Sequence, residues 1–440
     1  MILLYSEKIT PPIEYIGQLI FTQILNIEVS FSTNSTEFKN SNLPKFNYSS
    51  KKFADEFYIK PNKFIHDKNL SAPTINKVWY EGENYFFESS KDSVFPFDPL
   101  AASFYLVTRH EEYVEKERDE LGRYPVEKSI LSEYKLLKKP VVNIWAQLIA
   151  KKLHKQYPEL IFPERKFKFI STIDIDNAWA FKNKGFIRTT GAIIKSIIKG
   201  NFSELKLHVN VLNGKEKDPY DSYEYLNSVF KGNEDKVKFF FLLGNYGRFD
   251  KNISHKNISY RKLIKKIKDN FDIGIHPSFA SGQKDGEFKV KTEKDRLEEI
   301  TGIEITKNRQ HFVQLQFPNT YRRLINLGIT EDYTMGHAAQ PGFRAGICTP
   351  YYFYDLKKEK TTKLLIFPFH IMDGTLRHYL QLTPENALRE IKNIMLEVKK
   401  VGGTFVSIWH NETVNDKDCW KGYRKVFEKM NQMGFEWSNR

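Results

Sequence analysis

The sequence predicts an α/β fold with a mainly parallel sheet over its second half. From Lys166 onward, segments with strand character alternate with segments with helix character. KFKFISTID alternates apolar and polar residues, VKFFFLLGN is continuously apolar, and FDIGIH and TFVSIWH are shorter apolar runs that each end in histidine. A continuous apolar run is typical of a strand covered on both faces. Such alternation predicts a parallel sheet, either closed as a barrel or doubly wound.

Helix signals separate these strands. Asn319 is expected to cap a helix that stops at Gly328. Thr383 and Pro384 open a second helix. Its apolar residues recur every three or four positions, as one buried helix face requires, at Ala387, Ile391, Ile394 and Val398. Gly402 and Gly403 end this helix before TFVSIWH.

The first part of the chain has a different texture. The Ser- and Asn-rich stretch from Ser30 to Lys51 is expected to be a loop or a weak hairpin. VWYEGENYFFE suggests two strands with a turn from Glu81 to Asn84, and residues 98–153 have a helical pattern. Pro163 lies in a charged linker. We therefore predict a smaller α+β domain over residues 1–164, followed by the α/β domain over 165–440.

Composition narrows the functional class. At 440 residues with 40% hydrophobic residues, the chain is expected to fold into two or three packed domains. Its net charge of +14 comes from scattered lysines, which does not favour a nucleic-acid partner. Cys348 and Cys419 are too few for a disulfide framework. Without a signal peptide or an apolar membrane span, the expected location is the cytoplasm.

Reactive side chains gather at the ends of the candidate strands. In a parallel barrel these ends converge on one face, where barrel enzymes place their active sites. The residues are Asp174, Asp176, Asn245, His276, His311, Asp373 and His410. A carboxylate with two imidazoles is a common ligand set for zinc or another divalent metal. The alternatives are helix caps for the aspartates, hydrogen-bonded structural histidines, and surface ion pairs for Arg309 and Arg344.

The same segments resemble, in order and spacing, the motifs of the polysaccharide deacetylase (NodB-like) family over about residues 166–430. The strings that carry the resemblance are STIDIDNAW, GIHPSFAS, NRQHFVQLQFPNTYRRLINLGI, GFRAG, FPFHIMDGTL and VSIWHN. It implies a distorted (β/α) barrel, a divalent metal with zinc preferred, and hydrolysis of N-acetyl groups on a sugar or glycan.

The resemblance also implies roles for individual residues. Asp176, His276 and His311 are expected to hold the metal. Asp174 is expected to act as general base and His410 as general acid. The residues expected to orient these groups or bind the substrate are Arg309, Arg344, Asp373, Asn177 and Asn411.

One position departs from the family pattern. The family places its second metal-binding imidazole four residues after the first, where this chain has Ala280. Either the site has lost its metal, or another histidine replaces the missing one. His311 is the favoured replacement because it lies in the third motif at the next strand end, ahead of His337 and His370.

The N-terminal half resembles the accessory region of some bacterial polysaccharide-locus proteins in the string DPLAASFYLVTRHEEY. His110, Glu111 and Glu112 lack the second histidine of a zinc-binding H-E-x-x-H motif, because Val114 stands there. They are expected to form a helix with surface charges.

Three rival functions stay open, of which nucleic-acid binding through the net charge is the third. The first is a non-catalytic carbohydrate-binding protein on the same fold. The second is a glycoside hydrolase that uses Asp174 and Asp176 as its carboxylate pair.

Overall fold

A computed structural model of the chain describes residues 1–283 and 285–439. Among these residues, nine strands form one sheet that contains all the strand candidates of the second half. Across the sheet they are β12 (Tyr351–Asp355), β13 (Lys360–Ile366), β11 (Glu331–Asp332), β10 (Lys307–Asn308), β9 (Asp272–Ile275), β8 (Val237–Phe241), β7 (Lys168–Ile175), β15 (Thr404–His410) and β14 (Ile371–Met372). The predicted α/β class is confirmed.

Every neighbouring pair in this sheet is parallel except β12 and β13, which form an antiparallel pair at one edge. The carboxyl ends of the parallel strands therefore lie on one side of the sheet. The sheet curves back on itself, because residues 367–370 run from β13 to β14. Along this path the backbone N–H of Phe369 donates to Met335, and that of His370 donates to Val406. The regular ladder is interrupted there, so the described strands do not show a closed barrel, and the distorted (β/α) barrel stays a prediction.

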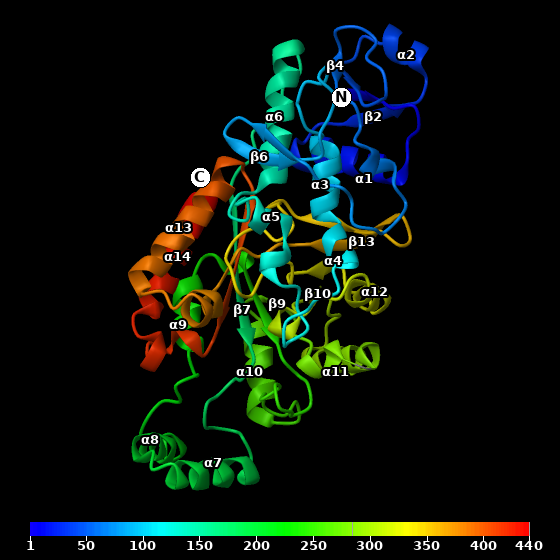
Figure 1. Cartoon of the computed structure of the whole chain (residues 1–440). Helices are drawn as coiled ribbons and strands as arrows, with labels where there is room; N and C mark the ends of the chain where they lie inside the picture. The colour runs from blue at the N-terminus through cyan, green and yellow to red at the C-terminus, as the bar shows by residue number, and fades with distance from the viewer. Residues whose placement is uncertain (284, 440) are drawn as a thin grey trace.

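Helices cover this sheet and extend beyond it (Figure 1). In the second half they are α7 (Phe186–Ile198), α8 (Phe202–Leu212), α9 (Tyr223–Phe230), α10 (Ile258–Lys268), α11 (Gly286–Thr301), α12 (Asn319–Asn326), α13 (Pro384–Lys400) and α14 (Tyr423–Ser438). α14 packs on β7, where the rings of Phe169 and Phe435 lie 5.2 Å apart. α7 and α8 project away from the rest of the molecule (Figure 1).

The two helices predicted in most detail differ at their starts. α13 begins at Pro384, and the Thr383 hydroxyl accepts a hydrogen bond from the Asn386 backbone, as expected for a cap. α12 instead begins at Asn319 itself, with Pro318 at the capping position and no side-chain cap bond. The predicted Asn319 cap is therefore wrong by one residue. Asn319 is the first residue of the helix.

The N-terminal part has its own four-stranded sheet. Its strands lie in the order β2 (Val29–Ser32), β1 (Ile2–Tyr5), β3 (Lys45–Asn47) and β4 (Phe57–Tyr58). All are parallel, so this part is itself α/β, whereas an α+β arrangement was expected. The antiparallel hairpin of β5 (Lys77–Tyr80) and β6 (Glu83–Phe86) follows, as predicted, but its turn is residues 81–82, so Glu83 and Asn84 of the expected turn belong to β6.

The expected loop from Ser30 to Lys51 is wrong, because this stretch contains β2, the short helix α2 (Ser35–Asn40) and β3. The Asn34 side chain caps α2 by accepting from the backbone of Thr36 and Glu37. Phe38 anchors the helix, with only 1% of its surface exposed. The prediction failed because Ser and Asn are common both in loops and at helix caps, and here they flank a short helix.

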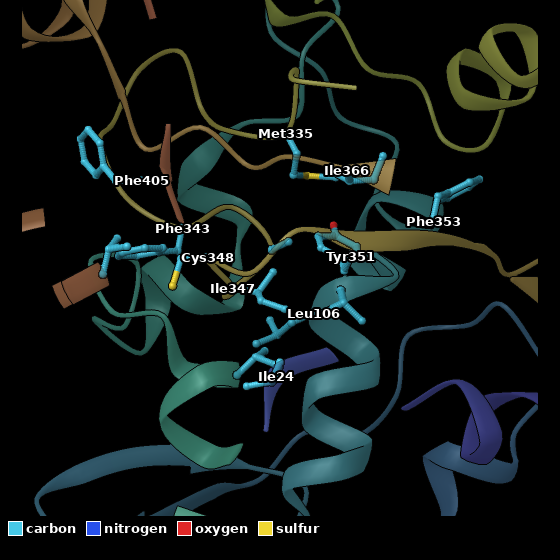
Figure 2. Packing of buried hydrophobic residues seen from close by; sticks show 14 of the residues in the cluster. Ile24, Leu106, Met335, Phe343, Ile347, Cys348, Tyr351, Phe353, Ile366 and Phe405 are labelled. Carbon is cyan, nitrogen blue, oxygen red and sulfur yellow. The ribbon is translucent and has the colours of Figure 1, made fainter. Parts of the chain in front are cut away.

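The remaining α-helices belong to the N-terminal part, and several of them contact the second half. They are α1 (Pro11–Gly17), α3 (Pro99–Val107), α4 (His110–Val114), α5 (Ile130–Glu133) and α6 (Val141–Gln156). Figure 2 shows the apolar contact, with Leu106 of α3 and Ile24 lying close to Ile347 and Tyr351 of the second half. Gly346 allows this approach at a φ of +66°, since an added Cβ would lie 2.7 Å from Leu106. The boundary between residues 164 and 165 stays a prediction.

Among the described residues, no helix is long and apolar enough to span a membrane. The predicted cytoplasmic location stays a prediction.

Candidate metal centre

Three predicted ligands meet at the carboxyl ends of three parallel strands. Asp176 directly follows β7, His276 directly follows β9, and His311 lies just after β10. One ligand atom from each can be chosen so that all lie within 4.8 Å of one another. Asp176 Oδ1 lies 3.1 Å from His276 Nε2, and Asp176 Oδ2 lies 3.3 Å from His311 Nε2. The sheet thus brings together one carboxylate and two imidazoles, a set that suits a divalent metal.

The other nitrogen of each imidazole is held by a hydrogen bond. His276 Nδ1 lies 2.6 Å from the carbonyl oxygen of Arg309, which can only accept, so this nitrogen is the donor. His311 Nδ1 lies 3.1 Å from Asp250 Oδ1. Both contacts leave Nε2 directed towards Asp176. Metal-binding histidines are usually fixed in this way, through a carbonyl or a carboxylate on the far ring nitrogen.

Asp250 is a functional candidate that the sequence interpretation missed. It lies in the loop after β8, and it accepts hydrogen bonds from the backbone N–H groups of Phe279 and Ala280, at 2.8 and 3.2 Å. Ala280 therefore helps to hold the carboxylate that orients His311. The position that lacks the family's histidine thus supports the imidazole proposed to replace it. Nothing in the local pattern around Asp250 points to this role, which depends on contacts with distant residues.

The electrostatics of the cluster reflect close pairing of opposite charges. Burial would raise the pKa of Asp176, but the neighbouring histidines outweigh it and hold that pKa well below its usual range. Burial would lower the pKa of His311, but Asp176 and Asp250 raise it to about 9. A cation bound between these groups would take the place of the imidazolium charge.

Buried atoms without partners indicate that the cluster fits a metal ion. Among the described residues, His276 Nε2, Asp176 Oδ1 and Asp174 Oδ1 are buried and have no hydrogen-bond partner. Leaving such atoms unsatisfied costs about 1–3 kcal/mol each. The three atoms belong to the proposed ligand set and the proposed base, and a bound cation with its water would satisfy them. The residues present therefore fit a divalent metal.

Asp174 lies next to the three predicted ligands but has a different partner. Its Oδ2 lies 3.4 Å from a guanidinium nitrogen of Arg309 and 3.8 Å from His276 Nε2. Arg309 is fully buried, and its other terminal nitrogen donates to Thr172 at 3.0 Å. The arginine thus positions Asp174 beside the cluster. It is not the surface ion pair that was kept as an alternative.

His410 lies at the end of β15 and faces the cluster from the side of Asp176. Its Nδ1 lies 2.9 Å from Asp373 Oδ1, and its backbone N–H donates to Asp373 Oδ2 at 2.8 Å. Thr413 also donates to that carboxylate, which is fully buried. Burial would lower the pKa of His410, but Asp373 raises it well above its usual range. His410 Nε2 lies 3.8 Å from Asp176 Oδ2 and therefore faces the cluster.

The two asparagines predicted to orient the site, Asn177 and Asn411, contact each other next to His410. The Asn411 amide donates to the carbonyl oxygens of Asn177 and Tyr220, at 3.2 and 3.0 Å. The Asn177 side-chain oxygen is buried without a hydrogen-bond partner among the described residues. Glu412, which was not predicted, lies beside His410, and its burial raises its pKa to about 7.

Arg344 and Asn245 contact residues other than these ligands. The Arg344 guanidinium pairs with Glu112 at 2.6 and 2.9 Å, and it lines a cavity of about 200 Å³ with His337 and Tyr124. Asn245 accepts from Arg296 at 2.9 Å. A role for Arg344 in binding substrate stays a prediction.

Comparisons with known proteins give low similarities. A model described as a family of unknown function (DUF7033) matches residues 2–158. A search of curated proteins returns no match.

Solved structures with some likeness include a protein from Mycobacterium smegmatis assigned to the polysaccharide deacetylases, with 13% identity and a TM-score of 0.38. The likeness covers 62% of this chain and 87% of that one. The polysaccharide deacetylase Bc1974 from Bacillus cereus has 11% identity and a TM-score of 0.31, and the likeness covers 62% of this chain and 89% of that one. A CE4 family pseudoenzyme from Bacillus anthracis has 12% identity and a TM-score of 0.28, and the likeness covers 61% of this chain and 62% of that one. A function for the chain therefore has to be argued from the residues of the site.

Proposed function

We propose that the chain is a metal-dependent hydrolase that removes N-acetyl groups from a sugar or glycan intermediate. The observation that carries this proposal is the cluster of Asp176, His276 and His311, with both imidazoles held at their outer nitrogens. Asp174 and His410 lie on either side of this cluster, which supplies a base and an acid within one site. The order of motifs from residue 166 onward supports an acetylated carbohydrate as the substrate.

The proposed mechanism divides the work among these residues. A divalent cation, with zinc preferred, would supply Lewis acidity towards the acetyl carbonyl and acidify a water molecule. Asp174 takes the proton of the attacking water on its free Oδ1, and Arg309 holds the other oxygen. His410 carries a proton on Nε2 and delivers it to the departing amine. Asp373 keeps the ring protonated before this step, because it stabilises the imidazolium through Nδ1.

The first test is metal content together with acetate release. Protein purified without chelator should carry about one divalent ion per chain and release acetate from at least one N-acetyl sugar in a panel. His276→Ala should abolish both, because it removes a ligand. His255→Ala is the matched control, since His255 is a half-buried loop histidine outside the cluster. If the wild type stays metal-free after loading with zinc, cobalt and manganese, the metal site does not exist. Metal binding without hydrolysis of any substrate would instead favour a non-catalytic carbohydrate-binding protein.

The second test separates the two aspartates. Asp174→Asn should keep the metal and lower the hydrolysis rate by at least about 100-fold, the usual scale for loss of a general base. Asp176→Asn should weaken metal binding, because it removes the shared carboxylate ligand. Both are measured by elemental analysis and single-turnover kinetics. The opposite result would mean that the base and the ligand have been exchanged.

A further inference from the structure

Helix α7 and the residue that opens α8 expose an unusual number of large apolar side chains. Phe186, Ile187 and Ile198 are 83%, 85% and 79% exposed, which is close to the exposure of a free chain. The same segment also exposes Ile194, Ile197 and Phe202 by more than half. Single exposed apolar residues are common on protein surfaces, but a contiguous group marks an interaction site.

The spacing of these residues places them on one face of α7. Ile194 and Ile198 follow Ile187 by seven and eleven positions, which brings all three to the same side of a helix. Phe186 directly precedes Ile187 and Ile197 directly precedes Ile198, so these two residues widen the apolar face on one side. Ser196, nine positions after Ile187, lies on the opposite side of the helix and is buried. In Figure 1 α7 and α8 lie together, joined to the body by two extended links. The exposed fractions of the apolar side chains show that this face is open to solvent.

The segment that carries this apolar face has a strong excess of basic residues. Residues 182–217 contain eight basic and two acidic residues. The basic ones are Lys182, Lys184, Arg188, Lys195, Lys199, Lys206, Lys215 and Lys217. An apolar helix face bordered by lysines is the pattern of helices that lie in the interface of an anionic membrane. Lysine stems can extend along the helix so that the ammonium groups reach the headgroups.

A second copy of the chain suits this surface less well. Two copies related by a twofold axis would present the same face to each other. Their basic residues would then come together, and like charges brought together at an interface are costly. Anionic headgroups instead complement the lysines, while the acyl region receives the isoleucines and phenylalanines. We propose that the α7–α8 hairpin docks the protein onto the surface of an anionic lipid bilayer.

The hairpin is tied to the loops that build the metal centre. The Asp218 carboxylate accepts from the backbone N–H groups of Ala180 and Phe181, at 2.8 and 2.9 Å, and so fixes the link after β7. Arg188 of α7 donates to the carbonyl oxygens of Lys251 and Asn252, at 2.8 and 2.9 Å. These residues directly follow Asp250, the partner of His311. Arg188 and Asp218 therefore join the docking hairpin to the segments that lead into the metal centre.

Vesicle co-sedimentation tests this proposal with the full chain. The wild type should sediment with phosphatidylcholine vesicles that contain about 30% phosphatidylglycerol, and far less with phosphatidylcholine alone. Raising the salt to about 0.5 M should weaken binding, since it screens the lysines. The variant Ile187→Glu/Ile198→Glu should lower the bound fraction at least about tenfold, because it places two charges in the apolar face. Both residues are exposed, so the variant should melt at the wild-type temperature.

Ile258→Glu is the matched control, because Ile258 is 71% exposed on α10, outside the hairpin. It should bind vesicles as the wild type does. The proposal is overturned if the wild type ignores anionic vesicles, or if the double variant binds as well as the control. A wild-type dimer that the double variant converts to a monomer, with no vesicle binding by either, would overturn it in favour of self-association. None of these readouts depends on hydrolytic activity.

Discussion

Replacing His311 with alanine is expected to lower zinc affinity by more than about 100-fold and to abolish hydrolysis. The loss should exceed the 10- to 100-fold that follows from removing a partner of a metal ligand, because the ligand itself is removed. No histidine stands at position 280 to compensate, since this chain has Ala280 there. Competition with a zinc indicator measures the affinity, and acetate release measures the rate.

Two further variants give zinc affinities with which the His311→Ala result can be compared. Asp250→Asn should give an intermediate loss of about 10- to 100-fold in zinc affinity, because it weakens the hydrogen bond that orients His311. His337→Ala should leave zinc affinity unchanged, since His337 is buried near Arg344 and outside the cluster. Zinc binding that survives His311→Ala intact would rule out His311 as the replacement ligand.

The positions of Asp176 and His276 were predictable because each follows a recognisable strand. Asp176 and His276 end apolar segments, and parallel strands bring such ends to one side of a sheet. His311 could be placed only through its position in the motif order, because β10 is just two residues long. Asp250 could not be found in this way, since its role depends on backbone donors about thirty residues away at Phe279 and Ala280.

The fold was predictable where local pattern and tertiary structure agree. The continuous apolar run of β8 and the periodic face of α13 both reappear at the expected residues. Prediction failed where polar residues serve distant partners. Glu112 was expected to lie on the surface of its helix, but its side chain is fully buried. Its partner Arg344 lies 232 residues away, and no local pattern announces such a pair.

This pair lies at the junction of the two halves and forms part of a larger buried network. Glu112 accepts two hydrogen bonds from Arg344, at 2.6 and 2.9 Å, and one from Arg109 at 2.7 Å. Arg109 in turn donates to the carbonyl oxygen of Arg344 and to Glu111. Burial would raise the pKa of Glu112, but the two guanidinium groups outweigh it and hold that pKa below its usual value of 4.5.

Glu112→Gln is therefore expected to lower the free energy of unfolding by about 3–5 kcal/mol, the cost of leaving a buried charge without its partner. Both arginines would stay buried, and only Arg109 would keep a carboxylate, that of Glu111. The shift of the urea midpoint measures the effect. Asp295→Asn is the control, because Asp295 pairs with Lys291 on the surface of α11, where such a pair contributes at most about 0.5 kcal/mol.

The pH dependence of the same variant has a defined sign. A carboxylate whose pKa is lowered by folding contributes stability above its unfolded pKa, and this contribution is lost as the pH falls through the folded value. The stability difference between the wild type and Glu112→Gln should thus be full at neutral pH and shrink below about pH 4.5. Urea midpoints at several pH values measure it. A difference that stays constant with pH, or that is no larger than that of Asp295→Asn, would mean that the Glu112 charge does not hold the two halves together.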